Sequence, residues 1–243
     1  MLALAKTTNK AAPRPAAWDA AVLSDAAALS GNPLEELERV RNVNFARRRV
    51  KRGEALFNSG GEFGSLYSIR SGFFKTIAID REGREQVTGF YMAGELLGLD
   101  GIGAGAYDVT AIALEDSEVC AMPFGMLEGF AREMPDFQRH LHSMLAREIV
   151  ANHGIMMLLG SMTAEQRVAA FLMNLSKRFE RRGYSPTEFH LRMSREEIGT
   201  YLGIKLETVS RVLSHMQHEG MLEVQGKYLR IASPERLLAS LKS

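Results

Sequence analysis

The 243-residue chain has one cysteine, Cys120, and no histidine before His140. A single cysteine excludes an internal disulfide framework and any metal cluster held only by cysteines of one chain. No run of about 18 apolar residues occurs, so the sequence predicts no transmembrane helix. The first residues lack a long apolar core followed by a cleavage site, and we therefore expect a cytoplasmic protein without a membrane partner.

The chain also lacks a strong excess of charge of either sign. Its formal net charge is +1, with 46% hydrophobic and 24% charged residues, which is typical of a globular protein with a real core. From Thr163 onward, 13 Lys and Arg face 9 Asp and Glu, whereas the preceding part has 17 and 20. This basic excess is mild for a nucleic-acid-binding protein, and it gains meaning only where a motif locates it.

Three boundaries divide the chain. Residues 1–20 are rich in alanine, contain two prolines and show no periodicity, which predicts a disordered tail. A first domain is expected at residues 21–130, beginning with a short helix at about 32–41. A long helix at 131–161 then leads to a second domain at 162–243.

Glycines punctuate the first domain. Of the 22 in the chain, 12 fall between Gly53 and Gly105 and separate short runs of β-favouring residues. These runs are residues 66–69, 73–79, 85–91, 109–114 and 118–122. Arg70-Ser71-Gly72 and the segment from Asp80 to Gly83 have the composition of hairpin connections. Several short strands at regular spacing predict a small β-barrel or β-roll.

After Pro123 the pattern becomes helical from about Ala131 to Ser161, a length that favours a helix with a partner. One apolar stripe is expected to face the chain's own roll and contains Phe137, Leu141, Met144 and Leu158. A second stripe recurs at alternating spacings of three and four residues, which is typical of a coiled-coil seam and predicts a homodimer. Its members are His142, Leu145, Ile149, Asn152, Met156 and Leu159. The alternative is one wide face buried within a single chain.

The second domain contains two short helices joined by a glycine turn. A capping box at residues 163–166 starts one helix, and a second capping box at 194–197 starts another. Gly203 ends that second helix, and the next is expected from Lys205 to about His218. Such a pair is the signature of a helix-turn-helix. Two strands around a glycine turn at 221–231 are predicted to form a wing.

The last of these helices leaves polar side chains outside its apolar stripe. A recognition helix places its N-terminal residues against base edges in the major groove. Arg211 can donate two hydrogen bonds to guanine and Glu207 can accept one from cytosine, so this pair, four residues apart, is predicted to read one G·C base pair. Ser210 is expected to reach a neighbouring base or phosphate. The predicted DNA-backbone contacts are Lys205, Thr208, Arg195 and Lys227.

A plainer interpretation applies to the same residues. A Glu–Arg pair four residues apart is usually a solvated surface ion pair. The DNA-reading interpretation therefore depends on the place of this pair in a capped helix-turn-helix with a wing.

Three segments make the chain recognisable: residues 65–72, Gly94-Glu-Leu-Leu-Gly98 and Leu206-Glu-Thr-Val-Ser-Arg211. From about Phe45 to Ile231 the chain resembles the CRP/FNR family of bacterial regulators, and it is most similar to the FNR branch. The resemblance implies an α+β fold with an N-terminal, cyclic-nucleotide-binding-like β-roll, a long dimerisation helix and a C-terminal winged helix-turn-helix.

The resemblance also implies the partners. A homodimer would bind palindromic double-stranded DNA with half-sites of the TTGAT type, where Glu207 and Arg211 serve the G·C pair and Ser210 the adjacent thymine. RNA polymerase would be contacted by surface loops of the roll, with Arg70, Ser71, Gly72, Asp80 and Arg84 as the residues. The chain is expected to be a regulator and no enzyme.

The sensing half departs from the family's pattern. FNR-type oxygen sensors hold an iron–sulfur cluster with several N-terminal cysteines, whereas this chain has only Cys120, at the roll position. Cyclic-nucleotide members use a Gly-Glu pair for the ribose, present as Gly94 and Glu95, and an Arg-Ser pair for the phosphate. Tyr107 and Asp108 appear at the phosphate positions, and a carboxylate there would repel the ligand.

No histidine precedes His140, so the roll has no imidazole for haem or for a cupin-like metalloenzyme, the remote alternative. His140 and His142 are expected at the surface. We therefore expect no cofactor and no metal. The sensor candidates are Cys120, Gly94 and Glu95, although a lone cysteine on a roll strand is usually a small buried hydrophobe. A ligand- or redox-gated regulator remains the main alternative.

Asn152 bears on dimerisation. FNR-type sensors that dimerise conditionally tend to carry an acidic residue near this point of the seam, where like charges meet. A neutral asparagine can pair with its symmetry mate, which favours a dimer that needs no cofactor.

Overall fold

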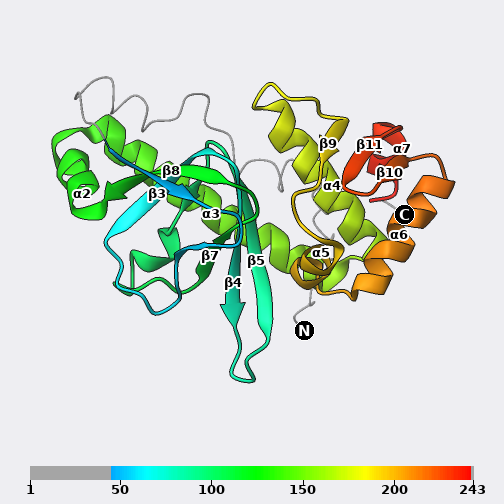
Figure 1. Cartoon of the computed structure of the whole chain (residues 1–243). Coiled ribbons are helices and arrows are strands. Elements are labelled where there is room, and N and C mark those ends of the chain that lie inside the picture. The colour runs from blue at the N-terminus through cyan, green and yellow to red at the C-terminus, as the bar shows by residue number, and fades with distance from the viewer. Residues whose placement is uncertain (1–44, 242–243) are drawn as a thin grey trace, which may run out of the picture.

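The computed structural model describes residues 45–241. The predicted tail at 1–20 and the predicted helix at 32–41 lie outside the described residues. Figure 1 shows a β-roll and a smaller, mainly helical C-terminal domain lying side by side, joined by one long helix. No helix within residues 45–241 combines the length and the apolar character needed to cross a membrane.

The roll consists of two antiparallel four-stranded sheets. One has the order β1-β8-β3-β6, and the other has the order β2-β7-β4-β5. The strands of the first sheet are β1 (Ala46–Val50), β8 (Ser117–Pro123), β3 (Ser65–Ser71) and β6 (Leu96–Leu97), and those of the second are β2 (Ala55–Phe57), β7 (Thr110–Ala113), β4 (Phe73–Ile79) and β5 (Glu85–Met92). A short 3₁₀ helix, η2 (Leu99–Gly101), follows β6.

The two predicted hairpin connections have different outcomes. β4 and β5 pair with Ile79 opposite Glu85, so the loop from Asp80 to Gly83 closes a hairpin as predicted. The prediction for Arg70-Ser71-Gly72 is wrong, because β3 and β4 lie in different sheets and this segment links them. Gly72 (φ +97°) passes so close to Ser117 that a Cβ atom would collide with its side chain.

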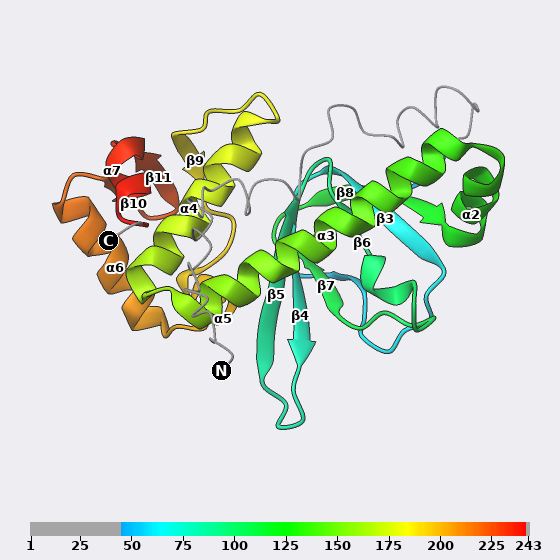
Figure 2. The same ribbon diagram turned by 180° about the vertical axis from the view of Figure 1, so that it is seen from behind.

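The predicted long helix is two helices. α2 (Phe124–Glu133) is followed by α3 (Pro135–Ser161), so the long helix begins at Pro135 and not at Ala131. Met134 between them has an extended backbone, φ −128° and ψ 94°. A proline disfavours helical geometry in the residue before it, which explains the break. In Figure 2, α3 runs along the roll and ends at the C-terminal domain.

The C-terminal domain begins with α4 (Ala164–Glu180), whose N-terminal capping box is formed by Thr163 and Gln166 as predicted. Next come β9 (Glu188–His190), α5 (Arg195–Leu202), α6 (Leu206–His218), β10 (Leu222–Gln225), β11 (Tyr228–Ile231) and α7 (Pro234–Ala239). β10 and β11 are the predicted wing, and β9, which the sequence did not indicate, adds a third strand beside β11.

One hydrophobic core crosses the boundary between the two domains. Phe73, Ile77 and Phe90 of the roll belong to the same buried cluster as Phe171 of α4 and Leu202 of α5. Burying this apolar surface favours the contact between the domains. The C-terminal domain is therefore packed directly onto the β4–β5 side of the roll.

Candidate nucleic-acid interface

α5 is held at both ends by local hydrogen bonds. The Oγ of Ser194 accepts from the backbone N–H of Glu197 at 3.1 Å, and the Glu197 carboxylate accepts from the N–H of Ser194 at 2.6 Å. Gly203 ends the helix in the left-handed region with φ +63°. At Gly199 a Cβ would lie 2.6 Å from the carbonyl oxygen of Ile204, so this glycine allows the turn to fold tightly against α5.

α6 presents a polar face to solvent. Its apolar side is fixed by Val209, Leu213 and Met216, which are buried against the rest of the domain. Glu207 and Arg211 are exposed. Lys205 is exposed at the N-cap, whereas Ser210 and Thr208 are half-buried. The base-reading residues predicted from sequence thus lie on one accessible face, and the helix is amphipathic as the motif requires.

The structure brings two predicted contacts together across the turn. Nη1 of Arg195, the first residue of α5, donates a hydrogen bond to Oγ of Ser210 at 3.2 Å. The sequence predicted a phosphate contact for Arg195 and a base contact for Ser210, and it did not indicate that they touch.

Glu207 and Arg211 do not form the surface ion pair of the plainer interpretation. Among the ion pairs within residues 45–241, none joins these two side chains. Both groups are exposed on adjacent turns of α6. An exposed ion pair gains little free energy, so its absence costs the free protein little.

The wing carries the last predicted backbone contact. β10 and β11 are joined by a two-residue turn of Gly226 (φ +60°) and Lys227. Lys227 is exposed, and its Nζ donates to the carbonyl oxygen of Arg192 at 3.5 Å. The lysine therefore lies at the tip of the wing.

α3 exposes much of the predicted dimer seam. Ile149 and Met156 are 55% and 61% exposed, and His142 and Asn152 are also exposed. Leu145 is half-buried. A run of exposed apolar side chains along a helix is typical of an interface.

Two residues of α3 differ in burial from a fully exposed surface. Leu159, assigned to the seam, is half-buried and packs partly against the chain's own core, beside Gly203. His140, expected at the surface, is half-buried, and its Nε2 is enclosed without a hydrogen-bond partner. Of the stripe predicted to face the roll, Phe137, Leu141 and Leu158 are buried and Met144 is half-buried.

The predicted polymerase contacts form two separate places. Arg70, Ser71 and Gly72 precede β4, whereas Asp80 and Arg84 lie at its far end, where the β4–β5 hairpin projects from the body (Figure 1). At about 3.4 Å per residue, the seven residues of β4 separate these loops by roughly 20 Å. Asp80 accepts a hydrogen bond from Nε of Arg84 at 2.7 Å, and hydrogen bonds from the backbone and side chain of Arg84 lower its pKa.

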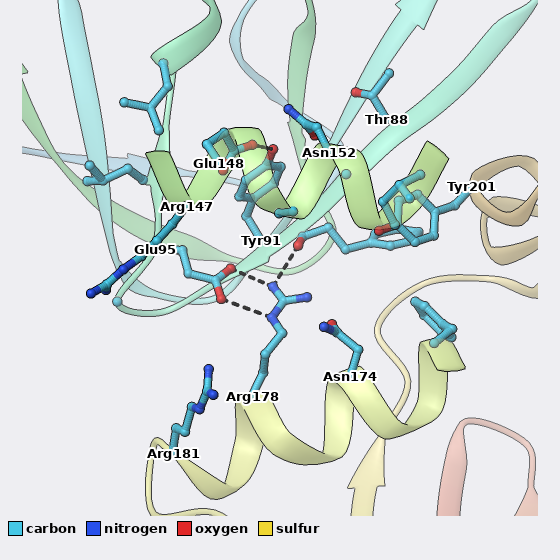
Figure 3. Close-up of a pocket in the computed structure, with 18 of the residues that line it drawn as sticks. Thr88, Tyr91, Glu95, Arg147, Glu148, Asn152, Asn174, Arg178, Arg181 and Tyr201 are labelled. Carbon is cyan, nitrogen blue, oxygen red and sulfur yellow. Dashed lines mark hydrogen bonds and ion pairs between the residues drawn. The ribbon is translucent and has the colours of Figure 1, made fainter. Parts of the chain in front are cut away.

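Glu95 follows Gly94 (φ +86°) in the turn after β5, and two arginines of the C-terminal domain, Arg178 and Arg182, bind it. Figure 3 shows the two bonds from Arg178 to the Glu95 carboxylate. The carboxylate accepts from Arg178 at 2.5 and 3.0 Å and from Arg182 at 2.6 Å. Burial alone would raise the pKa of Glu95, but the two guanidinium groups hold it below its usual value. The sequence indicated Glu95 as a sensor candidate and did not indicate these partners.

A cavity of about 260 Å³ lies beside this ion pair, between β5, α3 and α4. Figure 3 shows Tyr91 and Glu148 on its wall, and the Tyr91 hydroxyl donates to the Glu148 carboxylate at 3.1 Å. Burial raises the pKa of Glu148, although the bond from Tyr91 opposes this. Gly94 and Glu95, two of the three sensor candidates, line this cavity, whereas Cys120 is not among its lining residues.

Known proteins match both halves of the chain. The Crp-like helix-turn-helix domain family matches residues 166–240, and the cyclic nucleotide-binding domain family matches residues 47–133. The fumarate and nitrate reduction regulatory proteins of Salmonella typhimurium and Escherichia coli K12 are each 43% identical to this chain. The alignments cover 84% and 83% of this chain and 82% and 81% of those proteins. The chain belongs to the CRP/FNR family of transcriptional regulators.

Solved structures agree with this assignment. FixK2 from Bradyrhizobium japonicum has a TM-score of 0.72 at 29% identity and covers 80% of this chain and 96% of its own. The c-di-GMP-responsive regulator CLP of Xanthomonas campestris has a TM-score of 0.64 at 26% identity, over 82% and 99%. The α+β fold and the family resemblance predicted from sequence are confirmed.

The roll of this CRP/FNR regulator does not fit a cyclic nucleotide. Glu95, at the position that would bind the ribose, is occupied by Arg178 and Arg182. Tyr107, at a phosphate position, is buried, stacks on Phe57 with ring centroids 4.0 Å apart, and donates from its hydroxyl to the carbonyl of Ser65. These side chains supply no cation for a phosphate.

Cys120 does not fit a cluster ligand. It is 3% exposed on β8 and packs in an apolar cluster with Leu66, Met122 and Phe137. Because the chain has no other cysteine, a four-thiolate cluster cannot form within it.

Proposed function

We propose that this regulator binds palindromic DNA as a homodimer, with half-sites of the TTGAT type. Glu207 and Arg211 would read one G·C pair, and Ser210 the neighbouring thymine. Lys205, Thr208, Arg195 and Lys227 would contact phosphates and fix the register. The observation that carries the proposal is the exposed polar face of α6, where Glu207 and Arg211 are accessible.

The homodimer would form along α3. Its exposed side chains, Ile149 and Met156 above all, support a seam between two copies. Two recognition helices would then lie about one DNA turn apart, roughly 34 Å, which requires a palindromic operator. We further propose that the dimer acts with RNA polymerase in the cytoplasm and without an iron–sulfur cluster, haem or cAMP.

The test combines sedimentation with DNA binding, both in air. The expected result is a dimer that binds a TTGAT palindrome tightly and binds the same sequence with both G·C pairs exchanged at least about tenfold more weakly. A monomer in air, or equal affinity for both duplexes, would contradict the proposal.

A second candidate is a ligand-gated regulator, which the cavity beside Tyr91 and Glu148 favours. Protein freed of small molecules by unfolding, washing and refolding tests it. If the refolded protein binds the operator only after a filtrate of cell extract is added, the ligand-gated candidate replaces the cofactor-independent one.

A further inference from the structure

We propose that Glu95 is a positioning residue for DNA binding: the roll fixes the orientation of the recognition helix through the Glu95–Arg178–Arg182 ion pairs. This inference rests on the proposed function, since it concerns how a dimer presents two copies of α6. In this chain the Gly94-Glu95 turn would join two domains, a role different from binding a ligand.

Glu95, Arg178 and Arg182 form a specific contact between the two domains, which we call the Glu95 clamp. Glu95, Arg178 and Arg182 have side chains only 12–15% exposed. Arg178 also donates to the carbonyl oxygen of Phe90 at 2.7 Å, and Arg182 donates to that of Ala93 at 2.6 Å. Arg178 thus binds the Glu95 carboxylate and the backbone of β5, and Arg182 binds the same carboxylate and the backbone of the turn. Charge-assisted bonds of this kind are short, strong and directional.

A second link reaches the helix-turn-helix itself. Nζ of Lys75 on β4 lies 2.9 Å from the carboxylate of Glu197, and both side chains are largely buried. Glu197 completes the capping box of α5 with the N-cap residue Ser194, so this ion pair ties the roll to the start of the helix-turn-helix. Gln86 on β5 donates to the carbonyl oxygen of Thr200, further along α5.

Aromatic packing fills the space between these polar links. Phe90 of β5 lies 5.1 Å from Tyr201 of α5 and 6.0 Å from Phe171 of α4, measured between ring centroids. Apolar contacts alone would tolerate rotation of one domain on the other. The directional ion pairs at both ends of the aromatic contact select one orientation.

This orientation is compatible with DNA binding. The links use the N-terminus of α5 and the far end of α4, whereas Glu207 and Arg211 stay exposed on α6. The clamp therefore leaves the reading face accessible. Its effect is to hold the two heads of a dimer at a fixed spacing, which raises the effective concentration of the second head once the first is bound.

Glu95→Gln tests the proposal because it keeps the shape and removes the charge that both arginines bind. On a palindromic TTGAT duplex we expect affinity to fall about tenfold or more. On a duplex with one half-site, affinity should stay within about twofold of the native value. One added base pair between half-sites rotates the second by roughly 35°, and the variant should lose the native protein's discrimination against that operator.

Two further variants complete the design. Lys75→Met removes the other link without touching Glu95, so it carries the test if Glu95→Gln does not fold, and the same pattern is expected. Asp116→Asn is the matched control, because it breaks an exposed ion pair with Lys51 inside the roll. This control should bind both duplexes as the native chain does.

The outcomes separate the two proposals. If the native chain fails to bind the palindrome as a dimer, the proposed function fails before any variant is compared. If it binds, and Glu95→Gln and Lys75→Met keep native affinity and native spacing preference, the positioning role is wrong. An equal loss on the single half-site would also overturn it, since that pattern means damage to the head itself.

Discussion

Arg195 donates a hydrogen bond from Nη1 to Oγ of Ser210 at 3.2 Å, and so joins the first residue of α5 to the exposed face of α6. A serine that accepts from a guanidinium group still has its own hydroxyl hydrogen to donate. The bond therefore leaves the Ser210 hydroxyl hydrogen available for donation. A donor at this place can serve a thymine O4 or a phosphate oxygen.

This hydrogen bond predicts that substitutions of Arg195 and Ser210 have coupled effects on the free energy of operator binding. Arg195→Ala and Ser210→Ala should each weaken operator binding, but the double variant should lose less than the sum. Residues in direct contact couple by about 0.5–3 kcal/mol. A double-mutant cycle by fluorescence anisotropy measures this. Strict additivity would mean that the bond is absent from the complex.

Replacing Arg211 and replacing Lys205 should weaken DNA binding in different ways. Arg211→Ala is expected to cost about 1–3 kcal/mol at the cognate operator and to relax preference at one base pair. Lys205→Ala should weaken binding to all DNA sequences about equally and reduce the salt slope of binding by about one. Titrations on operators with single-base changes at two salt concentrations separate them. A uniform loss for Arg211→Ala would make it a phosphate contact.

Asn152→Asp should weaken the dimer. Asn152 is exposed on α3 in the single chain, and two aspartates meeting across the seam would repel each other. Sedimentation should show the equilibrium shift toward monomer, more strongly at low salt because salt screens the charges. Ser143→Asp adds the same charge to the same helix outside the seam and should leave the dimer intact. Equal behaviour of the two variants would place the dimer contact elsewhere.

Glu148→Gln should stabilise the protein at neutral pH. Burial raises the pKa of this carboxyl group, and its charged surroundings are Glu95, Arg178 and Asp100. A carboxyl whose pKa is raised on folding contributes stability below its unfolded pKa, which is lost as pH rises through the folded value. Glutamine never ionises and still accepts from Tyr91.

Urea unfolding at pH 7 and pH 4 measures this effect. The variant should gain stability at pH 7 and little at pH 4. Glu95→Gln should lose stability at pH 7. The pKa of Glu95 is lowered on folding, so its ionised form stabilises the fold above about pH 4.5. A loss at pH 7 for Glu148→Gln would mean that its charge has a partner.

Cys120→Ala should leave operator binding unchanged, with or without peroxide. The thiol is buried among apolar side chains, which slows its reaction with oxidants. Thiol titration of the native protein should find it unreactive until urea is added. Loss of binding on oxidation in the native chain, but not in Cys120→Ala, would instead support the redox-gated alternative.

Local patterns predicted much of this structure. β4 has the predicted bounds, both capping boxes form, and Gly203 ends α5, because neighbouring residues decide each of these features. Pro135 itself indicates the break between α2 and α3, which the helical periodicity alone does not show. β1 was missed because Arg47, Arg48 and Arg49 give it no apolar alternation.

The contacts between domains were beyond these patterns. Glu95 and Arg178 are 83 residues apart, and nothing in the chain between them specifies that they meet. The burial of the His140 Nε2 and the contact of Leu159 with Gly203 likewise depend on how separate elements pack. Periodicity indicates which face of a helix is apolar, but not which neighbour covers it.

The Glu95 clamp also bears on chimeric regulators made by exchanging sensor halves. A foreign roll grafted before α3 would leave Arg178 and Arg182 buried without their carboxylate, an expensive arrangement for two cations. Such hybrids should express poorly unless the acceptor turn carries a glutamate at this place. Glu95, Arg178 and Arg182 should therefore be kept together when the sensor and DNA-binding halves of these regulators are exchanged.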